Sequence, residues 1–147
     1  MYESTRITNK NLLEPELSYK IQGIFYNVSN KYGQGLKEQI YQKALAEELT
    51  KNNIIFEQQK RINIFSIDSG KVLGSYVPDF LVENKIILEI KASSFTTKQD
   101  VTQQISYLKA SIYEIGYLVN FGTNKLYVSR SIFTNNRKQF ISSMQNT

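Results

Sequence analysis

The chain has 147 residues, close to the roughly 150 residues of one ordinary domain, and 41% of them are hydrophobic, including eight Phe and ten Tyr. This composition predicts one globular domain over residues 1–147 that buries a sizeable core. The sequence contains no Cys and no His, which excludes disulfides, zinc–thiolate and iron–sulfur sites, catalytic triads with an imidazole base, and histidine-bound metals. Any acid–base or metal chemistry therefore depends on carboxylates, lysines and tyrosines.

Eighteen basic side chains against thirteen acidic ones give a net charge of +5 and an isoelectric point near 9.3, which favours a polyanionic partner such as nucleic acid. The basic residues are scattered from Arg6 to Lys138 without a long run, so any basic face must be assembled by folding. The first residues are polar, and no stretch approaches the ~18 apolar residues of a membrane span. We therefore expect a cytoplasmic protein that does not bind membranes.

Two helices are predicted in the first third of the chain. Apolar residues at helical spacing between Pro15 and Gly33 predict a first helix over about 15–32, because Pro suits a first helical turn and Gly suits a helix end. After the Gly-Gln-Gly turn that follows, a second apolar stripe predicts a helix that runs to about Asn52. From Ile54 the pattern changes to extended chain. Short turns separate four predicted extended segments, at residues 54–58, 61–67, 72–82 and 85–92.

A third helix and two further strands are predicted after residue 96. Thr97, with Asp100 three residues later, resembles a capping box at the start of this helix. The apolar stripe that follows predicts a helix reaching Gly116 and consists of Val101, Ile105, Leu108 and Ile112. Strands are expected at 116–121 and 125–133, and the polar tail from Asn135 suits a short helix or a frayed end. Hairpins combined with at least one helical crossover predict an α/β or α+β fold with a mixed sheet.

The second helix begins with a carboxylate in an unusual place. At ~100° per residue, Glu38 points in the same direction as Leu45 and Leu49, with Tyr41 alongside. A carboxylate on the apolar side of a helix is costly unless a cation, a metal or several hydrogen-bond donors meet it. Glu38 is therefore a candidate catalytic residue. Alternatively, it complements the helix dipole in the first turn and faces solvent.

Three charged side chains share one face of a predicted hairpin. Side chains alternate along a strand, so Glu89 and Lys91 lie on one face, and a turn at 83–85 would place Asp79 opposite Glu89. Two carboxylates that hold a hard divalent cation, with a lysine beside them, suit metal-assisted hydrolysis of a phosphodiester. The alternative is a salt-bridge ladder on a solvent-facing edge of the sheet.

Together, four short motifs resemble those of a known family. They are Gly35-Leu36-Lys37-Glu38-Gln39-Ile40-Tyr41, which matches G-x-x-E-x-x-Y, then Pro78-Asp79, Glu89-Ile90-Lys91 and Gln103-x-x-x-Tyr107. Over roughly residues 15–133 the chain resembles the GxxExxY family of the PD-(D/E)XK nuclease superfamily. The resemblance implies a restriction-endonuclease-like αβββαβ core, with a mixed central sheet flanked by helices and polar extensions at both ends of the chain.

The resemblance also implies an active site built around a metal ion. Asp79 and Glu89, together with the Ile90 carbonyl, would bind Mg²⁺ or Mn²⁺. Glu38 would be the helix acid that completes the metal shell, and Lys91 would serve the attacking water. No iron–sulfur cluster is expected, because the chain has no cysteines.

The resemblance also concerns residues on the third predicted helix and near the end of the first. Gln103 would belong to the active site, with Tyr107 and Tyr41 as supporting residues. Gln103 and Tyr107 lie opposite the apolar stripe of their helix, so they either face a second covered surface or simply form its polar side. Many relatives carry a His near the end of the first helix, where this chain has Ser29. No role in this protein can therefore depend on an imidazole.

The function expected from these patterns is a small Mg²⁺-dependent nuclease that cuts DNA by attack of a metal-activated water. Two alternatives stay open. One is a non-catalytic module on the same fold that binds nucleic acid or a protein, because a fold does not establish a function. The other is a subunit whose activity needs a larger defence or repair complex. A homodimer is a further hypothesis, since two copies would address two strands.

Overall fold

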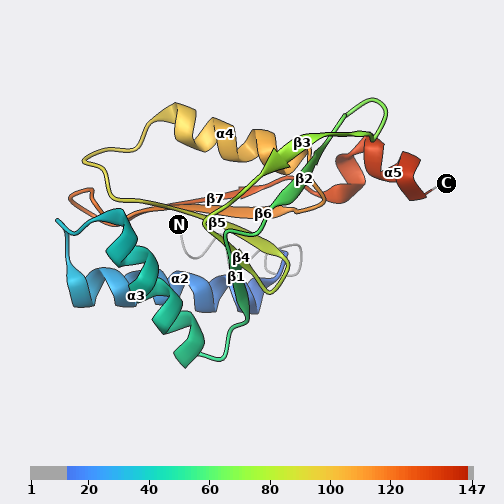
Figure 1. Cartoon of the computed structure of the whole chain (residues 1–147). Helices are drawn as coiled ribbons and strands as arrows, with labels where there is room; N and C mark the ends of the chain where they lie inside the picture. Colours follow the sequence, from blue (N-terminus) through green and yellow to red (C-terminus); the bar gives the residue numbers. More distant parts are fainter. Residues whose placement is uncertain (1–12, 146–147) are drawn as a thin grey trace.

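The computed structural model describes residues 13–145, and Figure 1 shows the arrangement of its elements. The helices are α2 (Pro15–Tyr32), α3 (Glu38–Lys51), α4 (Lys98–Lys109), the 3₁₀ turn η2 (Asn135–Arg137) and α5 (Gln139–Gln145). The strands are β1 (Phe56–Gln58), β2 (Ile62–Phe65), β3 (Val72–Tyr76), β4 (Phe80–Val82), β5 (Ile86–Lys91), β6 (Ile115–Asn120) and β7 (Tyr127–Ile132). The helix predicted over 15–32 is confirmed, and the second predicted helix begins at Glu38.

Five strands form a mixed central sheet in the order β1-β4-β5-β6-β7. β5 and β6 run parallel and are joined through α4, whereas the other neighbouring strands pair antiparallel. α2 and α3 cover one face of the sheet and α4 covers the other (Figure 1). This architecture confirms the mixed α/β fold with a restriction-endonuclease-like arrangement of sheet and helices.

The two faces of the sheet are packed very differently. Alternate residues of the central strands, such as Leu88 and Ile90 on β5, enter a large apolar core with α2 and α3. The opposite face has a small apolar cluster of Leu81, Ile87 and Leu108 with β2. Leu118 and the polar side chains of Glu89 and Lys91 also lie on that face. The helix α4 therefore covers a surface that is only partly apolar.

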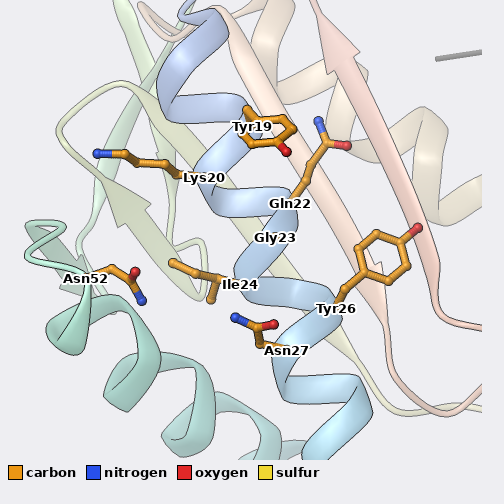
Figure 2. A pocket seen from close by; sticks show the side chains of 8 residues that line it. All are labelled: Tyr19, Lys20, Gln22, Gly23, Ile24, Tyr26, Asn27 and Asn52. Carbon is orange, nitrogen blue, oxygen red and sulfur yellow. The ribbon is translucent and has the colours of Figure 1, made fainter.

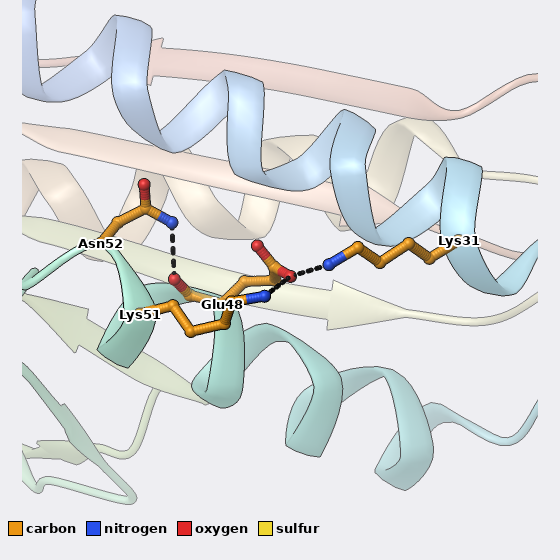
Figure 3. A network of polar contacts seen from close by, with 4 residues as sticks. All are labelled: Lys31, Glu48, Lys51 and Asn52. Carbon is orange, nitrogen blue, oxygen red and sulfur yellow. Dashed lines mark hydrogen bonds and ion pairs between the residues drawn. The ribbon is translucent and has the colours of Figure 1, made fainter.

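A buried carboxylate ties the two helices of the large core together (Figure 3). Glu48 of α3 is 7% exposed and forms ion pairs with Lys31 of α2 and, at 3.6 Å, with Lys51 of its own helix. The hydrogen bond with Lys31, ahead of a smaller opposing effect of burial, holds the pKa of Glu48 below its ordinary value. Glu48 is thus a charge that the protein itself compensates.

The strand predicted over 72–82 is wrong, because this segment forms two strands in two sheets. β3 pairs only with β2 in a separate two-stranded sheet, while β4 joins the central sheet between β1 and β5. Pro78 lies between them, and a proline has no N–H for a sheet ladder and a fixed φ. The break at Pro78 places Asp79 at the start of β4.

The third predicted helix is too long, and its buried side was assigned incorrectly. α4 ends at Lys109, and Ile112 beyond it is 46% exposed. Gln104 and Leu108 are the buried residues of this helix, whereas Val101 and Ile105 are only half-buried. The helix packs over Gly116 of β6, where a Cβ would lie 2.8 Å from the Gln104 side chain. Gly116 thus leaves room for the polar side chain of Gln104. The spacing of apolar residues along the helix could not predict this, because it marks only apolar positions as buried. The predicted Thr97–Asp100 capping box is confirmed.

The tail is ordered as η2 and α5 up to residue 145, which confirms the short helix that was one of its two predicted forms. Lys138 is 3% exposed and its Nζ donates to the carbonyls of Ser111 at 2.8 Å and Tyr113 at 2.7 Å. Phe140 stacks on Phe65 of β2.

The polar extension predicted at the start of the chain lies, up to residue 12, outside the described residues. Across residues 13–145, none of the helices is long and apolar enough to span a membrane.

Candidate active site

The β4–β5 hairpin gathers three of the candidate residues. Its turn occupies residues 83–85, and Phe80 pairs with Leu88, so the same register places Asp79 opposite Glu89. Glu89 and Lys91 point away from the apolar core, toward the face that α4 covers, and both are half-buried. The predicted convergence of Asp79, Glu89 and Lys91 on one face of the sheet is therefore confirmed, and α4 covers that face.

Backbone amides and Lys91 only partly compensate the two strand carboxylates. The Ile90 N–H donates to Asp79 Oδ2 at 2.7 Å. Burial raises the pKa of Asp79 above its ordinary value, against the opposing effects of this hydrogen bond and of Lys91. Burial raises the pKa of Glu89 to about 7, although Lys91 and a backbone hydrogen bond from Asp79 oppose the shift. The site therefore holds a desolvated acid whose charge is incompletely balanced.

Glu38 reaches the same site from α3. It is the first residue of this helix and is exposed, whereas Leu45 and Leu49 further along the same side are fully buried. Partial burial of its carboxyl and, next in size, the charge of Asp79 raise the pKa of Glu38, while Lys91 lowers it. Gln42 Nε2 lies 3.4 Å from Glu38 Oε2. Glu38 thus lies at the mouth of the helix, outside the apolar core, but within electrostatic reach of the strand acids.

The contacts of Tyr41 give a structural reason for a tyrosine three residues after Glu38. Its side chain is fully buried, and its hydroxyl donates to the Gly33 carbonyl and accepts from the Leu36 N–H at 3.3 Å. The ring stacks on Phe121, with centroids 4.7 Å apart, and the Phe121 N–H donates to the Lys91 carbonyl at 2.9 Å. Tyr41 therefore holds the glycine-containing loop before Glu38 against the end of the strand that carries Lys91.

A cavity of about 210 Å³ separates the hairpin from α4. It is lined by Tyr76, Val77, Glu89, Lys91, Asp100, Gln103, Gln104 and Leu118. The structure thus brings Gln103 to the cavity. Tyr107 does not line it but stacks on Tyr76, which does, with ring centroids 3.7 Å apart. Tyr107 is half-buried against Tyr76, whereas Gln103 is exposed although it lines the cavity, so neither of the two interpretations that the sequence left open holds for both residues.

Two polar residues of this site were missed by the sequence analysis. Gln104 is 3% exposed; its Nε2 donates to the Tyr117 carbonyl at 2.8 Å, and within residues 13–145 its Oε1 has no hydrogen-bond donor. Asn120 is fully buried at the end of β6, in register with Lys91. The available signals were weak: a second Gln beside the motif residue, and a lone Asn at the end of an apolar strand.

The acidic side chains suit a hard divalent cation but do not form a complete cage. Within residues 13–145, no group of three or more acidic side chains is arranged closely enough to hold a metal ion. Asp79 and Glu89 nevertheless offer carboxylate oxygens, which Mg²⁺ and Mn²⁺ prefer, and their raised pKa values show that further positive charge would be favourable there. The donor set therefore fits a cation held by the strand pair and completed by other oxygen ligands.

A larger cavity, of about 440 Å³, lies along α2 (Figure 2). Figure 2 shows Tyr19, Gln22 and Tyr26 on one side of this helix, and Lys20 and Asn27 on the side that faces Asn52. The lining residues include no carboxylate, and none of the candidate residues belongs to them. Of these two cavities, the smaller one beside β5 is thus the one lined by candidate residues, namely Glu89, Lys91 and Gln103.

No protein of curated function matches the sequence significantly. Two solved structures are similar. The alkaline exonuclease LHK-Exo from Laribacter hongkongensis has 13% identity and a TM-score of 0.45, covering 90% of this chain and 75% of that one. SSO0001 has 19% identity and a TM-score of 0.44, covering 74% of this chain but 55% of that one, so this chain spans about half its length.

The family comparison covers most of the described fold. The family model of the PD-(D/E)XK nuclease superfamily matches residues 15–131, from the start of α2 into β7. The matched region includes the β4–β5 hairpin with Asp79, Glu89 and Lys91, as well as Glu38 and Gln103. The chain therefore belongs to the PD-(D/E)XK nuclease superfamily.

Proposed function

We propose that the chain is a nuclease that hydrolyses phosphodiester bonds of DNA with Mg²⁺ or Mn²⁺. One observation carries the proposal. Asp79 and Glu89 are paired at the end of one hairpin with Lys91 on the same face, and the pKa of Glu89 is raised to about 7 because burial exceeds the compensation from Lys91 and the backbone. Such a site is unfavourable for a purely structural ion pair and suits a cation and a phosphate.

The proposed metal ligands are Asp79, Glu89 and the Ile90 carbonyl, with Glu38 approaching from α3. When bound, the ion would acidify a water and neutralise charge on the phosphate. The exposed position of Glu38 allows it to complete the shell directly or through a water. Loss of either strand carboxylate should weaken the site most, because these two residues have the most desolvated carboxyls.

The chain's own residues would orient the reactants. The Lys91 ammonium, next to the carboxylates and facing the cavity, would donate hydrogen bonds to the attacking water and stabilise negative charge that develops on the phosphate oxygens. Gln103, on the opposite wall, would orient the same water or phosphate through its amide. Both groups are held by regular secondary structure, so their positions are set before substrate binds.

DNA is the proposed substrate because the net charge of +5 favours a polyanion.

The finer assignment to the GxxExxY family is also a proposal. It is supported by the role of Tyr41, since this tyrosine fixes the loop that presents Glu38 and so gives the Gly-Glu-Tyr spacing a physical reason. That two copies associate stays a prediction.

A second function is a non-catalytic nucleic-acid-binding module on the same fold. The observation in its favour is that the described residues contain no complete group of three acidic ligands and that Glu38 is exposed. A binder, however, would gain nothing from desolvated carboxylates that repel phosphate. Cleavage assays separate the two functions.

The test is cleavage of labelled DNA by the purified full chain. Labelled single-stranded and duplex DNA are incubated in Mg²⁺, in Mn²⁺ and in EDTA. Asp79→Asn and Asp68→Asn are assayed beside the parent. Asp68 is an exposed acid in the turn between β2 and β3, so its substitution is the matched control. We expect cleavage in either metal, none in EDTA, a loss of about 100-fold or more in Asp79→Asn, and parental activity in Asp68→Asn.

The result that contradicts the proposal is equally clear. Cleavage that persists in EDTA, or that is the same in Asp79→Asn and the parent, rules out this metal-dependent site. Binding of Mn²⁺ by calorimetry provides a second measurement, because Asp79→Asn should lose it while Asp68→Asn retains it. A parent that binds DNA but cleaves in neither metal supports the binding module.

A further inference from the structure

The loop between β5 and α4, residues 92–97, joins the two walls of the active-site cavity. It begins directly after Lys91 on one wall and ends at Thr97, the N-cap of α4, whose first turns place Asp100 and Gln103 on the other wall. A segment of six residues that connects both walls must pass along one end of the cavity. Residues 92–97 do not line the cavity itself, so their side chains would meet the part of a substrate that extends beyond it.

This loop is fixed by hydrogen bonds on both sides of its tip. Asn120 Oδ1 accepts from the Ser93 N–H at 3.1 Å, and Asn120 Nδ2 donates to Thr96 Oγ1 at 3.0 Å. Asn120 is fully buried and in register with Lys91, so the loop is anchored to the strand beside the catalytic lysine. Gly122 packs against the same segment, where a Cβ would lie 2.5 Å from the Ala92 carbonyl carbon.

Phe95 lies between these anchors and is 69% exposed. A large apolar ring in water is unfavourable, and Asn120 holds the chain on both sides of it, at Ser93 and Thr96. Phe95 lies four residues after Lys91, whereas Ile55, another exposed apolar residue, lies beside the 83–85 turn. A loop that is already anchored on both sides loses less conformational entropy when a ligand covers its side chains.

We propose that Phe95 stacks on an unpaired base of the nucleic acid, next to the phosphate that the site cleaves. The inference rests on the proposed function and specifies its substrate: single-stranded DNA or a frayed end, whose bases have open π faces. In an intact duplex both faces of a base are covered by neighbouring bases, so Phe95 could stack there only after a base is displaced.

The charges near the loop favour a nucleic acid as the occupant. Lys91 precedes the loop and the exposed Lys98 follows it as the first residue of α4, so a base on Phe95 would have basic side chains available for its flanking phosphates. A polyanion with flat aromatic groups at regular intervals satisfies both the ring and the lysines. A purely apolar partner would leave the lysines without a role.

The experiment measures binding of the full chain to a labelled single-stranded oligonucleotide in EDTA, where cleavage is prevented. Fluorescence anisotropy gives Kd for the parent, Phe95→Ala, Phe95→Leu and Phe95→Trp. Ile55→Ala, which truncates a side chain 71% exposed at the other end of the hairpin, is the matched control. We expect Phe95→Ala and Phe95→Leu to weaken binding by about 10-fold or more, Phe95→Trp to retain it, and Ile55→Ala to leave it unchanged.

A second arm uses an oligonucleotide in which abasic sites replace the bases. The parent should bind it as weakly as Phe95→Ala does, and Phe95→Ala should lose little further affinity, because the ring and the base are then parts of one interaction. In Mg²⁺, the parent should cleave the single strand faster than a blunt duplex, and Phe95→Ala should lose most of that preference.

Three results would overturn the inference. The first is an equal Kd for the parent and Phe95→Ala. The second is parental affinity in Phe95→Leu, which would indicate general apolar contact, and the third is a loss of affinity in Ile55→Ala as large as that in Phe95→Ala. Failure of the proposed function itself looks different: the parent then cleaves no DNA in either metal, whatever residue stands at position 95. A parent that cleaves while Phe95→Ala binds and cleaves normally disproves only the role of Phe95.

Discussion

The interface between α2 and α3 and the end of the β4–β5 hairpin each contain a covered carboxylate, but the pKa values of the two shift in opposite directions. Glu48 at the helix interface contacts Lys31 and Lys51, and its pKa is lowered. Burial raises the pKa of Glu89 to about 7, because Lys91 and one backbone group compensate it only in part. The protein satisfies a structural charge with its own cations and leaves the charge at the proposed site available to a ligand.

The comparison predicts that the lysine beside Glu89 matters for turnover. Lys91→Ala should lower the cleavage rate by about 100-fold or more while the fold stays intact, because a preorganised positive group is lost from the transition state. Lys85→Ala, at the turn of the same hairpin, is the control, since Lys85 is exposed and its ammonium pairs with the surface acid Glu14. Rates on labelled DNA, with circular dichroism to check folding, give the answer. Equal rates in Lys91→Ala and the parent would remove Lys91 from the mechanism.

The second prediction concerns the stability cost of Glu89 and its dependence on pH. Because the folded pKa, about 7, lies above the ordinary value of 4.5, the unfolded chain ionises first as pH rises. The folded state therefore loses stability between about pH 4.5 and 7 and keeps the full penalty above pH 7. Glu89→Gln should be more stable than the parent by roughly 1–3 kcal/mol at pH 8 without metal.

Urea unfolding in EDTA measures this difference. It should shrink toward zero near pH 4.5, where the parent carboxyl is protonated in the folded state. Addition of Mn²⁺ at pH 8 should raise the melting temperature of the parent and not of Glu89→Gln. If Glu89→Gln is less stable than the parent at pH 8, or if the difference in their unfolding free energies does not change with pH, the charge of Glu89 is compensated in the same way as that of Glu48.

The third and smallest effect is expected at the helix interface. Glu48→Gln should lower stability by about 1 kcal/mol at pH 7, because Lys31 and Lys51 lose their partner, and both lysines are exposed enough for water and salt to screen the pair. Glu47→Gln, at the exposed neighbouring position, is the control. Chemical denaturation should detect the loss in Glu48→Gln alone, with DNA cleavage unchanged. If Glu48→Gln were instead more stable than the parent, the charges of both Glu48 and Glu89 would lower the stability of the folded protein.

Much of the fold followed from local sequence patterns. The helix over 15–32, the capping box at Thr97 and the register of the β4–β5 hairpin each depend on residues close together in the chain, so periodicity and turn length were sufficient. The convergence of Asp79, Glu89 and Lys91 followed from that register. The site's strand side was therefore predictable without any long-range contact.

The remaining parts of the site depended on packing between distant segments. The sequence did not show that residues 72–82 divide between two sheets, because the choice of partner for β3 and β4 is a long-range one. Nor did it show that Gln104 is the buried residue of α4, since the space for its side chain comes from Gly116 on another element. Periodicity assigns a buried side by apolarity, and here a polar side chain occupies it.

The sequence by itself determined the fold class, the absence of histidine and cysteine chemistry, and the residues whose charges define the proposed site. Only the tertiary structure decided that α4 closes a cavity over Glu89, that Tyr41 holds the loop before Glu38, and that Asn120 fixes the loop carrying Phe95. The physical reason is that charge and periodicity are properties of the chain. Desolvation of a carboxylate and the rigidity of a loop arise only when segments far apart in sequence pack against each other.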